Sequence, residues 1–307
     1  MALNFSFNVA NFAIEIAGEI AGHLASAEIG SIKADSVDMP VASDYITKKA
    51  IGNVEYGDCT VVTGLSECQQ QLDWVGAIWR KDVLEKDGAI ILADMNFKER
   101  RRATFAGACV TEVKLDDLDA NNNKKPYQMT YKFAPEMLKF ESGSGAQLKG
   151  NLGMKQKSWN PANFRVKMGG LPCDRLTKVS GISVTSEVAK EYHGSFRFPT
   201  RHQANIKFGD ITLEISGDEK TFTEWNKFAT MTLQDGVCSE TEELTCVIEW
   251  LDPTLKNTLG TLTLLGCGLK EFKFGPKFEH AKSGMATCTA VFNMETFDPA
   301  GVVLSHK

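Results

Sequence analysis

Several segments of the chain alternate apolar and polar side chains, which is the pattern of a β-strand with one buried face. The clearest examples are residues 12–16 (Phe-Ala-Ile-Glu-Ile) and residues 164–168 (Phe-Arg-Val-Lys-Met), where every second side chain is apolar. Further strands are expected within residues 90–94, 102–115, 127–140, 244–250, 260–274 and 286–297. The pattern predicts a mainly β protein.

Two segments repeat apolar residues at helical spacing instead. The first set is Leu72, Val75 and Ile78 or Trp79, and the second is Phe222, Trp225 and Phe228. Near each set, two residues three apart suit a capping box: Ser66 with Gln69, and Thr221 with Glu224. The sequence therefore predicts two short helices among the strands.

The chain contains an internal repeat. Residues 12–18 match residues 164–170, and residues 53–60 (Asn-Val-Glu-Tyr-Gly-Asp-Cys-Thr) match residues 205–212 (Asn-Ile-Lys-Phe-Gly-Asp-Ile-Thr) at the same offset of 152 residues. An accidental match would rarely keep one offset across two separated blocks. In each copy, the apolar side chains before a Gly-Asp pair and those after it would face opposite sides of a regular strand. A bulge or turn is therefore expected at the Gly-Asp pair.

Later landmarks keep the same order in both copies. Trp74 matches Trp225 and, after a net insertion of eight residues, the second copy repeats four further positions. These are Gly107 with Gly266, Glu112 with Glu271, Lys114 with Lys273 and Phe133 with Phe292. We therefore expect one domain over residues 1–141, a flexible Gly/Ser-rich linker over residues 142–158 and a second domain over residues 159–307.

Composition narrows the class of protein. The chain has 307 residues, of which 43% are hydrophobic and 24% charged, and this balance is that of a globular protein. A net charge of -5 argues against a protein that binds nucleic acid by neutralising phosphates. No secretory signal or membrane span is expected. The eight cysteines show no zinc spacing and are expected to be buried thiols in a reducing compartment.

We find no pattern that indicates an enzyme, and we expect no catalytic residues, no cofactor and no metal. Asp117, Asp119 and Asn121 imitate the start of a calcium loop, but the sixth position is Asn122 instead of glycine and the twelfth is Gln128 instead of glutamate. A solvated hairpin loop explains this segment better. The chain has no GxSxG elbow, and its five histidines are scattered.

One basic cluster stands out, at Lys98-Glu-Arg-Arg-Arg102. It has no interleaved aromatic residues, so a solvated turn or a contact between subunits is favoured over phosphate binding. Acidic residues occupy a broadly corresponding place in the second copy. The candidate subunit contact pairs Arg100, Arg101 and Arg102 with Glu242 and Glu243 in a head-to-tail arrangement.

The order of these landmarks resembles the tail tube proteins of contractile phages, which are related to the tube proteins of type VI secretion and extracellular injection systems. The resemblance rests on an opening strand ending in glycine, a long loop, Tyr56-Gly-Asp-Cys-Thr60 or Phe208-Gly-Asp-Ile-Thr-Leu213, and a helix carrying Trp74 or Trp225. It implies a mainly β chain with short helices, folded as two tandem tail-tube-like β-barrel or sandwich domains.

The resemblance also implies a function. The chain would be a structural component of a contractile tail or injection machine, forming a homo-oligomeric inner tube through which DNA or effector passes without sequence-specific binding. Partners would be further copies, sheath and baseplate proteins, with no membrane. The expected location is the virion tail, assembled in the bacterial host cytoplasm; alternatives are the bacterial cytoplasm or an extracellular injection particle. Lumen-facing candidates are Glu15, Glu55 and Glu214.

The number of chains in the ring, the place of the chain in the machine and the class of protein remain open. A ring of three chains with both copies lining the channel is slightly favoured over six chains with one copy lining it. The long loops at residues 31–52 and 183–204 are expected to reach the next ring. The chain could also be a baseplate hub or tube-initiator ring, or, in another class, an enzyme or ligand-binding module built on a duplicated β-barrel.

Overall fold

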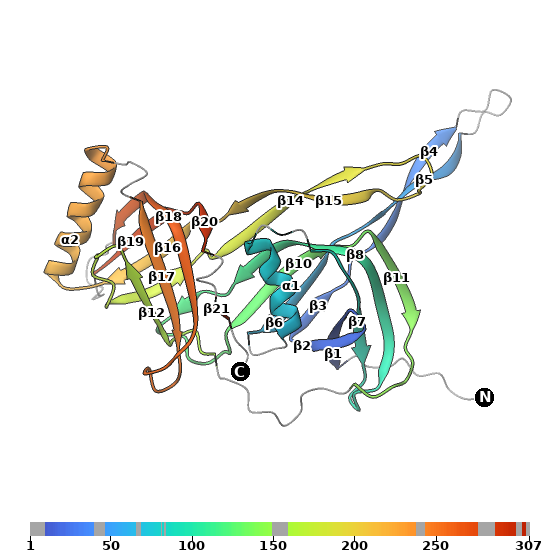
Figure 1. The fold of residues 1–307 in the computed structure, drawn as a ribbon, viewed down its shortest axis with the longest axis horizontal. Helices are drawn as coiled ribbons and strands as arrows, with labels where there is room; N and C mark the ends of the chain where they lie inside the picture. The colour runs from blue at the N-terminus through green and yellow to red at the C-terminus, as the bar shows by residue number, and fades with distance from the viewer. Residues whose placement is uncertain are drawn as a thin grey trace.

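The structure is a computed structural model, and it describes residues 10–39, 47–65, 69–80, 82, 84–148, 159–237, 243–275, 286–298 and 303–304. We call residues 10–148 the first half and residues 159–304 the second half. Figure 1 shows two barrel-like bodies side by side, one from each half. A long hairpin of the second half runs across to the first.

The first half forms a barrel-like sheet in the order β2-β1-β7-β8-β10-β6-β3, with β11 also paired to β8. Only Ala25 separates β2, which pairs with β1, from β3, which pairs with β6, so the sheet bends back on itself at this residue. The strands are β1 (Asn11–Ile16), β2 (Glu19–Leu24), β3 (Ser26–Glu28), β6 (Cys59–Gly64), β7 (Lys86–Ala93), β8 (Glu99–Leu115), β10 (Gln128–Ala134) and β11 (Met137–Ser142).

The second half follows the same path. Its order is β12-β17-β18-β19-β16-β13, with β20 and β21 on β18, and β9 (Leu118–Asp119) of the first half extends it beyond β13. The strands are β12 (Phe164–Met168), β13 (Leu176–Ser180), β16 (Ile211–Ser216), β17 (Leu244–Leu251), β18 (Thr258–Phe274), β19 (Thr287–Asn293), β20 (Thr296–Phe297) and β21 (Val303–Leu304).

The two barrels agree residue by residue in register. Phe133 on β10 faces Cys59, and the matching Phe292 on β19 faces Ile211. The long strands β8 and β18 carry the same irregularity, between Val110 and Glu112 in one and between Leu269 and Glu271 in the other. A shared bulge at the same place confirms the predicted duplication, because a one-residue slip would turn every side chain to the other face.

Each barrel carries the predicted helix, α1 (Gln69–Trp79) or α2 (Glu219–Ala229), and α2 continues into a π-helical turn, η1 (Thr230–Gln234). Trp74 and Trp225 are buried. Their rings contact the matching residues Phe133 and Phe292, with centroids 5.2 and 6.3 Å apart. An aromatic anchor therefore fixes each helix to its barrel.

The predicted helix starts differ from the structure. The side chain of Asp218, not Thr221, caps α2, because its carboxylate accepts the backbone N–H of Thr221 at 2.9 Å. A carboxylate is both a good acceptor and favourable at the positive end of a helix, so it takes precedence over a threonine three residues later. Ser66 of the other predicted capping box lies outside the described residues.

The two segments expected to be long loops are β-hairpins. Hairpin 1 consists of β4 (Ile32–Met39) and β5 (Lys48–Tyr56), and hairpin 2 of β14 (Ser183–Glu191) and β15 (Thr200–Phe208). Every residue of β4 is exposed, so β4 lacks the apolar alternation that identifies a half-buried strand. Hairpin 1 projects away from the barrel at the upper right of Figure 1.

One large hydrophobic cluster runs through both halves, and a smaller one joins Leu148 to β1 and β7. Where the two halves meet, Trp250 of the second half contacts Tyr127 of the first, with ring centroids 5.8 Å apart, and Trp159 at 6.0 Å. The cysteines among the described residues, Cys59, Cys109, Cys173, Cys246, Cys267 and Cys288, are free and buried. Burial raises the pKa of their thiols, at Cys59 to about 11. No helix in the described part of the chain has the length and apolar character needed to cross a bilayer.

Candidate assembly interface

The two halves are joined by strand addition in both directions. β14 of the second half pairs antiparallel with β8 of the first, and β9 of the first half pairs with β13 of the second. The first-half sheet therefore continues into hairpin 2. Main-chain pairing of this kind covers a sheet edge that would otherwise remain open.

The register of the β14–β8 junction defines which backbone groups carry it. Val184 lies opposite Val113, and Leu115 N–H donates to the carbonyl of Ile182 at 3.0 Å. Hydrogen-bonded pairs alternate along an antiparallel ladder, so the Val184–Val113 pair is also hydrogen-bonded. Both valines are buried. The N–H of Val184 thus faces the first half.

Arg201 on β15 is the most buried cation of the junction, with 5% of its surface exposed. Its guanidinium donates to the carboxylate of Asp58 at 3.1 Å and to the carbonyl oxygen of Tyr56. Its backbone N–H donates to the carboxylate of Glu136 at 3.1 Å. One arginine therefore ties hairpin 2 to three separate points of the first half.

The tip of hairpin 2 is held by Glu55 on β5. Lys190 and the hydroxyl of Tyr192 each donate to Oε1 of Glu55 at 2.9 Å. These hydrogen bonds, that from Lys190 first, lower the pKa of Glu55 below its ordinary value. Beside them, the N–H of Val54 donates to the carbonyl of Arg197 at 2.8 Å. The tip therefore contacts hairpin 1 as well as the barrel.

The equivalent surfaces of the other half have no strand partner in the described residues. Hairpin 1 forms a sheet of β4 and β5 alone. β18 pairs with β19 along residues 271–273, and no described strand lies on its opposite edge there. Hairpin 1 exposes 45% of Ile32 and 73% of Ile51. Hairpin 1 and the free edge of β18 thus correspond to hairpin 2 and the β8 edge, but they are not paired with each other.

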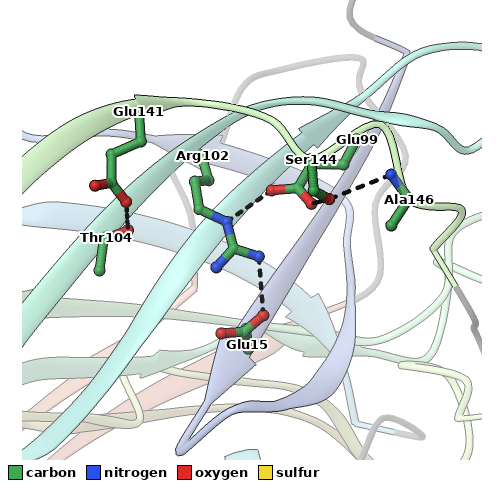
Figure 2. A network of polar contacts seen from close by, with 7 residues as sticks. All are labelled: Glu15, Glu99, Arg102, Thr104, Glu141, Ser144 and Ala146. Carbon is green, nitrogen blue, oxygen red and sulfur yellow. Dashed lines mark hydrogen bonds and ion pairs between the residues drawn. The ribbon is translucent and has the colours of Figure 1, made fainter.

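Figure 2 shows the part of the predicted basic cluster that bonds within the chain. Arg102 donates to Glu99 at 2.6 Å and to Glu15 at 3.1 Å, which links β8 to β1. Burial would raise the pKa of Glu99, but hydrogen bonds from Arg102 and from Ser144 bring it below the ordinary value. The cluster belongs to β8, which starts at Glu99, and is not a turn.

The remaining predicted site residues are spread over both halves. Arg100 pairs with Asp94 at 2.8 Å, and Arg101 is exposed on β8. Glu214 lies half-buried on β16, and Glu243 precedes β17. Glu242 lies outside the described residues. The head-to-tail contact between the arginines and these glutamates, and the lumen-facing positions of Glu15, Glu55 and Glu214, stay predictions.

Sequence reasoning did not single out Arg201, Asp58 or Lys190 as junction residues. Asp58 was visible in the repeated Gly-Asp motif, but its acceptor role was not, because Arg201 lies 143 positions away. The aligned blocks did carry one signal, the exchange of Glu55 for Lys207, which marks a charge that differs between otherwise matching strands.

The calcium-like segment is used for packing. Asp119 belongs to β9, and its carboxylate accepts the N–H of Asn121 at 2.8 Å. Leu118 is fully buried beside it. In the described residues no cluster of three or more His, Cys, Asp or Glu side chains could hold a metal ion.

The two barrels exchange strands, while hairpin 1 and one edge of β18 have no strand partner in the described residues. The family model described as "T4-like virus tail tube protein gp19" matches residues 8–128 and 160–298, which lie in the two copies of the repeat. The chain therefore belongs to the T4-like virus tail tube protein family, and it is a structural tube component.

No curated protein matches the chain. Among solved structures, it is similar to a chain of the sheath/tube terminator of the extracellular contractile injection system PVC (16% identity, 46% of this chain and 100% of that chain, TM-score 0.40). It is also similar to a chain of the PVC sheath-tube complex (13%, 44% and 86%, TM-score 0.38) and to Hcp1 from Flavobacterium johnsoniae (15%, 44% and 93%, TM-score 0.25).

Proposed function

We propose that three copies of this chain close into a ring of six barrels, and that such rings stack into the inner tube of a contractile tail or injection particle. In each ring, hairpin 1 of one chain adds to the β18 edge of the next. Within a chain, hairpin 2 already adds to β8 in the same manner. That internal junction is the observation that carries the proposal.

The match between the two junctions extends to individual residues. Hairpins 1 and 2 have the same strand register at an offset of 152 residues, since Ile32 faces Tyr56 as Val184 faces Phe208. The register also shifts at the equivalent position in both hairpins. On the receiving strands, Val113 corresponds to Phe272. The register therefore predicts Ile32 opposite Phe272 of the next chain and Lys33 opposite Glu271.

A ring follows from the direction of this contact. A hairpin on one side and a receiving edge on the other make a head-to-tail interface, which gives a closed ring where the rotation closes and a filament where it does not. Closure removes the open sheet edges that would otherwise aggregate. A six-chain ring lined by first halves alone would need the β8 edge, which hairpin 2 of the same chain already covers.

The contents and partners of the tube are part of the same proposal. DNA or effector would pass through the lumen without sequence-specific binding, which a chain of net charge -5 favours over tight phosphate contact. Glu15, Glu55 and Glu214 are the candidate lumen residues, and sheath and baseplate proteins the candidate outer partners. The particle is a phage tail or an injection device.

Native mass spectrometry and electron microscopy of the purified chain test the ring. We expect a closed species with three times the mass of the 33.7 kDa chain and six similar lobes around a hole. A ring of six chains, or a chain that stays monomeric at the concentrations used for these measurements, would contradict the proposal. Interfaces of obligate assemblies bury on the order of 2,000 Å² or more, so the ring should survive dilution.

A further inference from the structure

The two halves carry opposite charges at one pair of equivalent positions. In the internal junction Lys190 of hairpin 2 binds Glu55 of the first half, with a nitrogen–oxygen distance of 2.9 Å. At the offset of 152 residues, Lys190 corresponds to Asp38 of hairpin 1 and Glu55 to Lys207 of the second half. The registers of both hairpins fix these correspondences, because Lys190 lies opposite Arg201 as Asp38 lies opposite Lys49.

The other charged contacts of the junction keep their sign. Arg201 corresponds to Lys49, its acceptor Asp58 to Asp210, and Glu136 to Glu295, which approaches Gly266 as Glu136 approaches Gly107. A cation on the hairpin thus meets a carboxylate on either half. These contacts attract a hairpin to either receiving edge, and in the second half Asp210 also pairs with Lys270 at 2.5 Å.

We propose that the inverted pair selects which halves may join, so that hairpin 1 of one chain docks on the second half of another copy and not on its first half. The inference rests on the proposed ring. In the selected junction Asp38 meets Lys207, with the charges of the internal pair exchanged. In the rejected junction Asp38 meets Glu55, and two carboxylates face each other.

Neighbouring charges strengthen this choice. Asp35 of hairpin 1 lies close enough to Tyr192 to add to the rise of the Tyr192 pKa, which is caused first by the hydrogen bond to Glu55. Asp38 placed on the first half would therefore meet a second acid in addition to Glu55. In the second half, Glu187 already pairs with Lys207 at 2.5 Å, so either Asp38 or Lys190 placed there meets one charge of each sign. The first half is the more selective of the two surfaces.

The selection matters because the β8 edge and the β18 edge present the same pattern of backbone hydrogen-bonding groups. While a chain folds, its β8 edge can accept its own hairpin 2 or hairpin 1 of a neighbour, and the ladder alone does not tell them apart. Repulsion between like charges excludes the wrong partner, as pairs of charges do at other specific interfaces. The ring then alternates first and second halves at every junction.

Charge reversal in the full chain tests the inference. Asp38→Lys and Lys207→Glu each place like charges at the junction between chains, and the double variant restores an opposite pair. An exposed pair changes association by about 2- to 5-fold, so a ring closed by three junctions should lose on the order of 10- to 100-fold in stability in either single variant. The double variant should return to the wild-type level. Ring populations are measured by sedimentation velocity at low and high salt.

Lys256→Glu, in the exposed turn before β18, is the matched control for a change of net charge, and thermal melting followed by circular dichroism checks the fold. The inference is supported if both single variants form less stable rings, the double variant recovers the wild-type stability and the control has no effect. Single variants that assemble like the control, or a double variant that does not recover, overturn it while the three-chain ring stands. A wild-type chain that forms no three-chain ring overturns the proposed function and the inference together.

Discussion

At the scale of residues, the junction between the halves combines one buried cation with one exposed pair. The guanidinium of Arg201 donates to Tyr56 at the end of β5 and to Asp58 in the turn that follows. The side chains of Lys190 and Glu55 are 40% and 37% exposed, so water and salt weaken this pair. Arg201 therefore holds the hairpin, and the exposed pair adjusts which hairpin is held.

Acidification should loosen the tip of hairpin 2. The lowered pKa of Glu55 means that its ionised form is favoured in the folded state, so this stabilisation is present above the ordinary glutamate pKa of about 4.3 and is lost as the pH falls through the lowered value. Hydrogen-exchange protection of the Val54 N–H, which donates to Arg197, should fall over that range.

The variant Glu55→Gln isolates this effect. It should show weaker protection of Val54 at neutral pH and no step attributable to residue 55 on acidification. The two proteins differ only at residue 55, so the difference between the two profiles belongs to Glu55. Glu224→Gln, an exposed change on α2, is the control and should keep the wild-type profile. Identical profiles for the wild type and Glu55→Gln would refute the assignment.

At the scale of elements, the sequence predicted both helices and most of the barrel strands, but not β2, β3, β13 or the two hairpins. Residues 164–168 form β12 as expected, because their alternation is that of a strand buried on one face. Of β4 and β5, only Tyr56 packs against the hydrophobic cluster among the described residues, and most of their side chains are exposed. Period-two patterns report burial, so a strand completed by a partner leaves little trace in its own sequence.

A proline at Ile32 should break the junction between chains and leave the hairpin intact. By equivalence with Val184, the N–H of Ile32 points away from β5 and toward the next chain. Proline removes that donor at the first residue of β4, where an edge strand tolerates it. The carbonyl of Phe272 would lose its partner, at a cost of about 1–3 kcal/mol for each junction.

Ring formation measured by native mass spectrometry distinguishes this outcome from misfolding. Ile32→Pro should remain folded as a monomer with wild-type helix and strand content by circular dichroism. Ile32→Val, which copies the residue at the equivalent position of hairpin 2, should assemble normally. Rings of Ile32→Pro that are as stable as those of the wild type would show that β4 does not add to a neighbouring sheet.

At the scale of the whole molecule, duplication turns one contact between subunits into a contact within a chain. The repeat, the fold class and the resemblance to tail tubes were all accessible from the sequence, because they depend on spacing within each copy. The identity of the junction residues was not, since Arg201 and Asp58 come together only when strands of different halves pair. Their meeting depends on tertiary topology, which local patterns do not encode.

Because the contact is head to tail, a chain with a defective hairpin still keeps a working β18 edge. Mixing the wild type with Ile32→Pro in equal amounts should therefore produce open two-chain species that contain one copy of each, in which the variant supplies the edge and the wild type the hairpin. Pairs of two variant chains should be absent, and closed rings should fall. Native mass spectrometry with one partner isotopically labelled counts each combination. A two-fold symmetric contact would use both hairpins at once, so the variant would weaken the mixed pair as well. The head-to-tail ring is ruled out by a mixture that contains no mixed pairs. It is also ruled out by a mixture in which pairs of two variant chains are as frequent as mixed pairs.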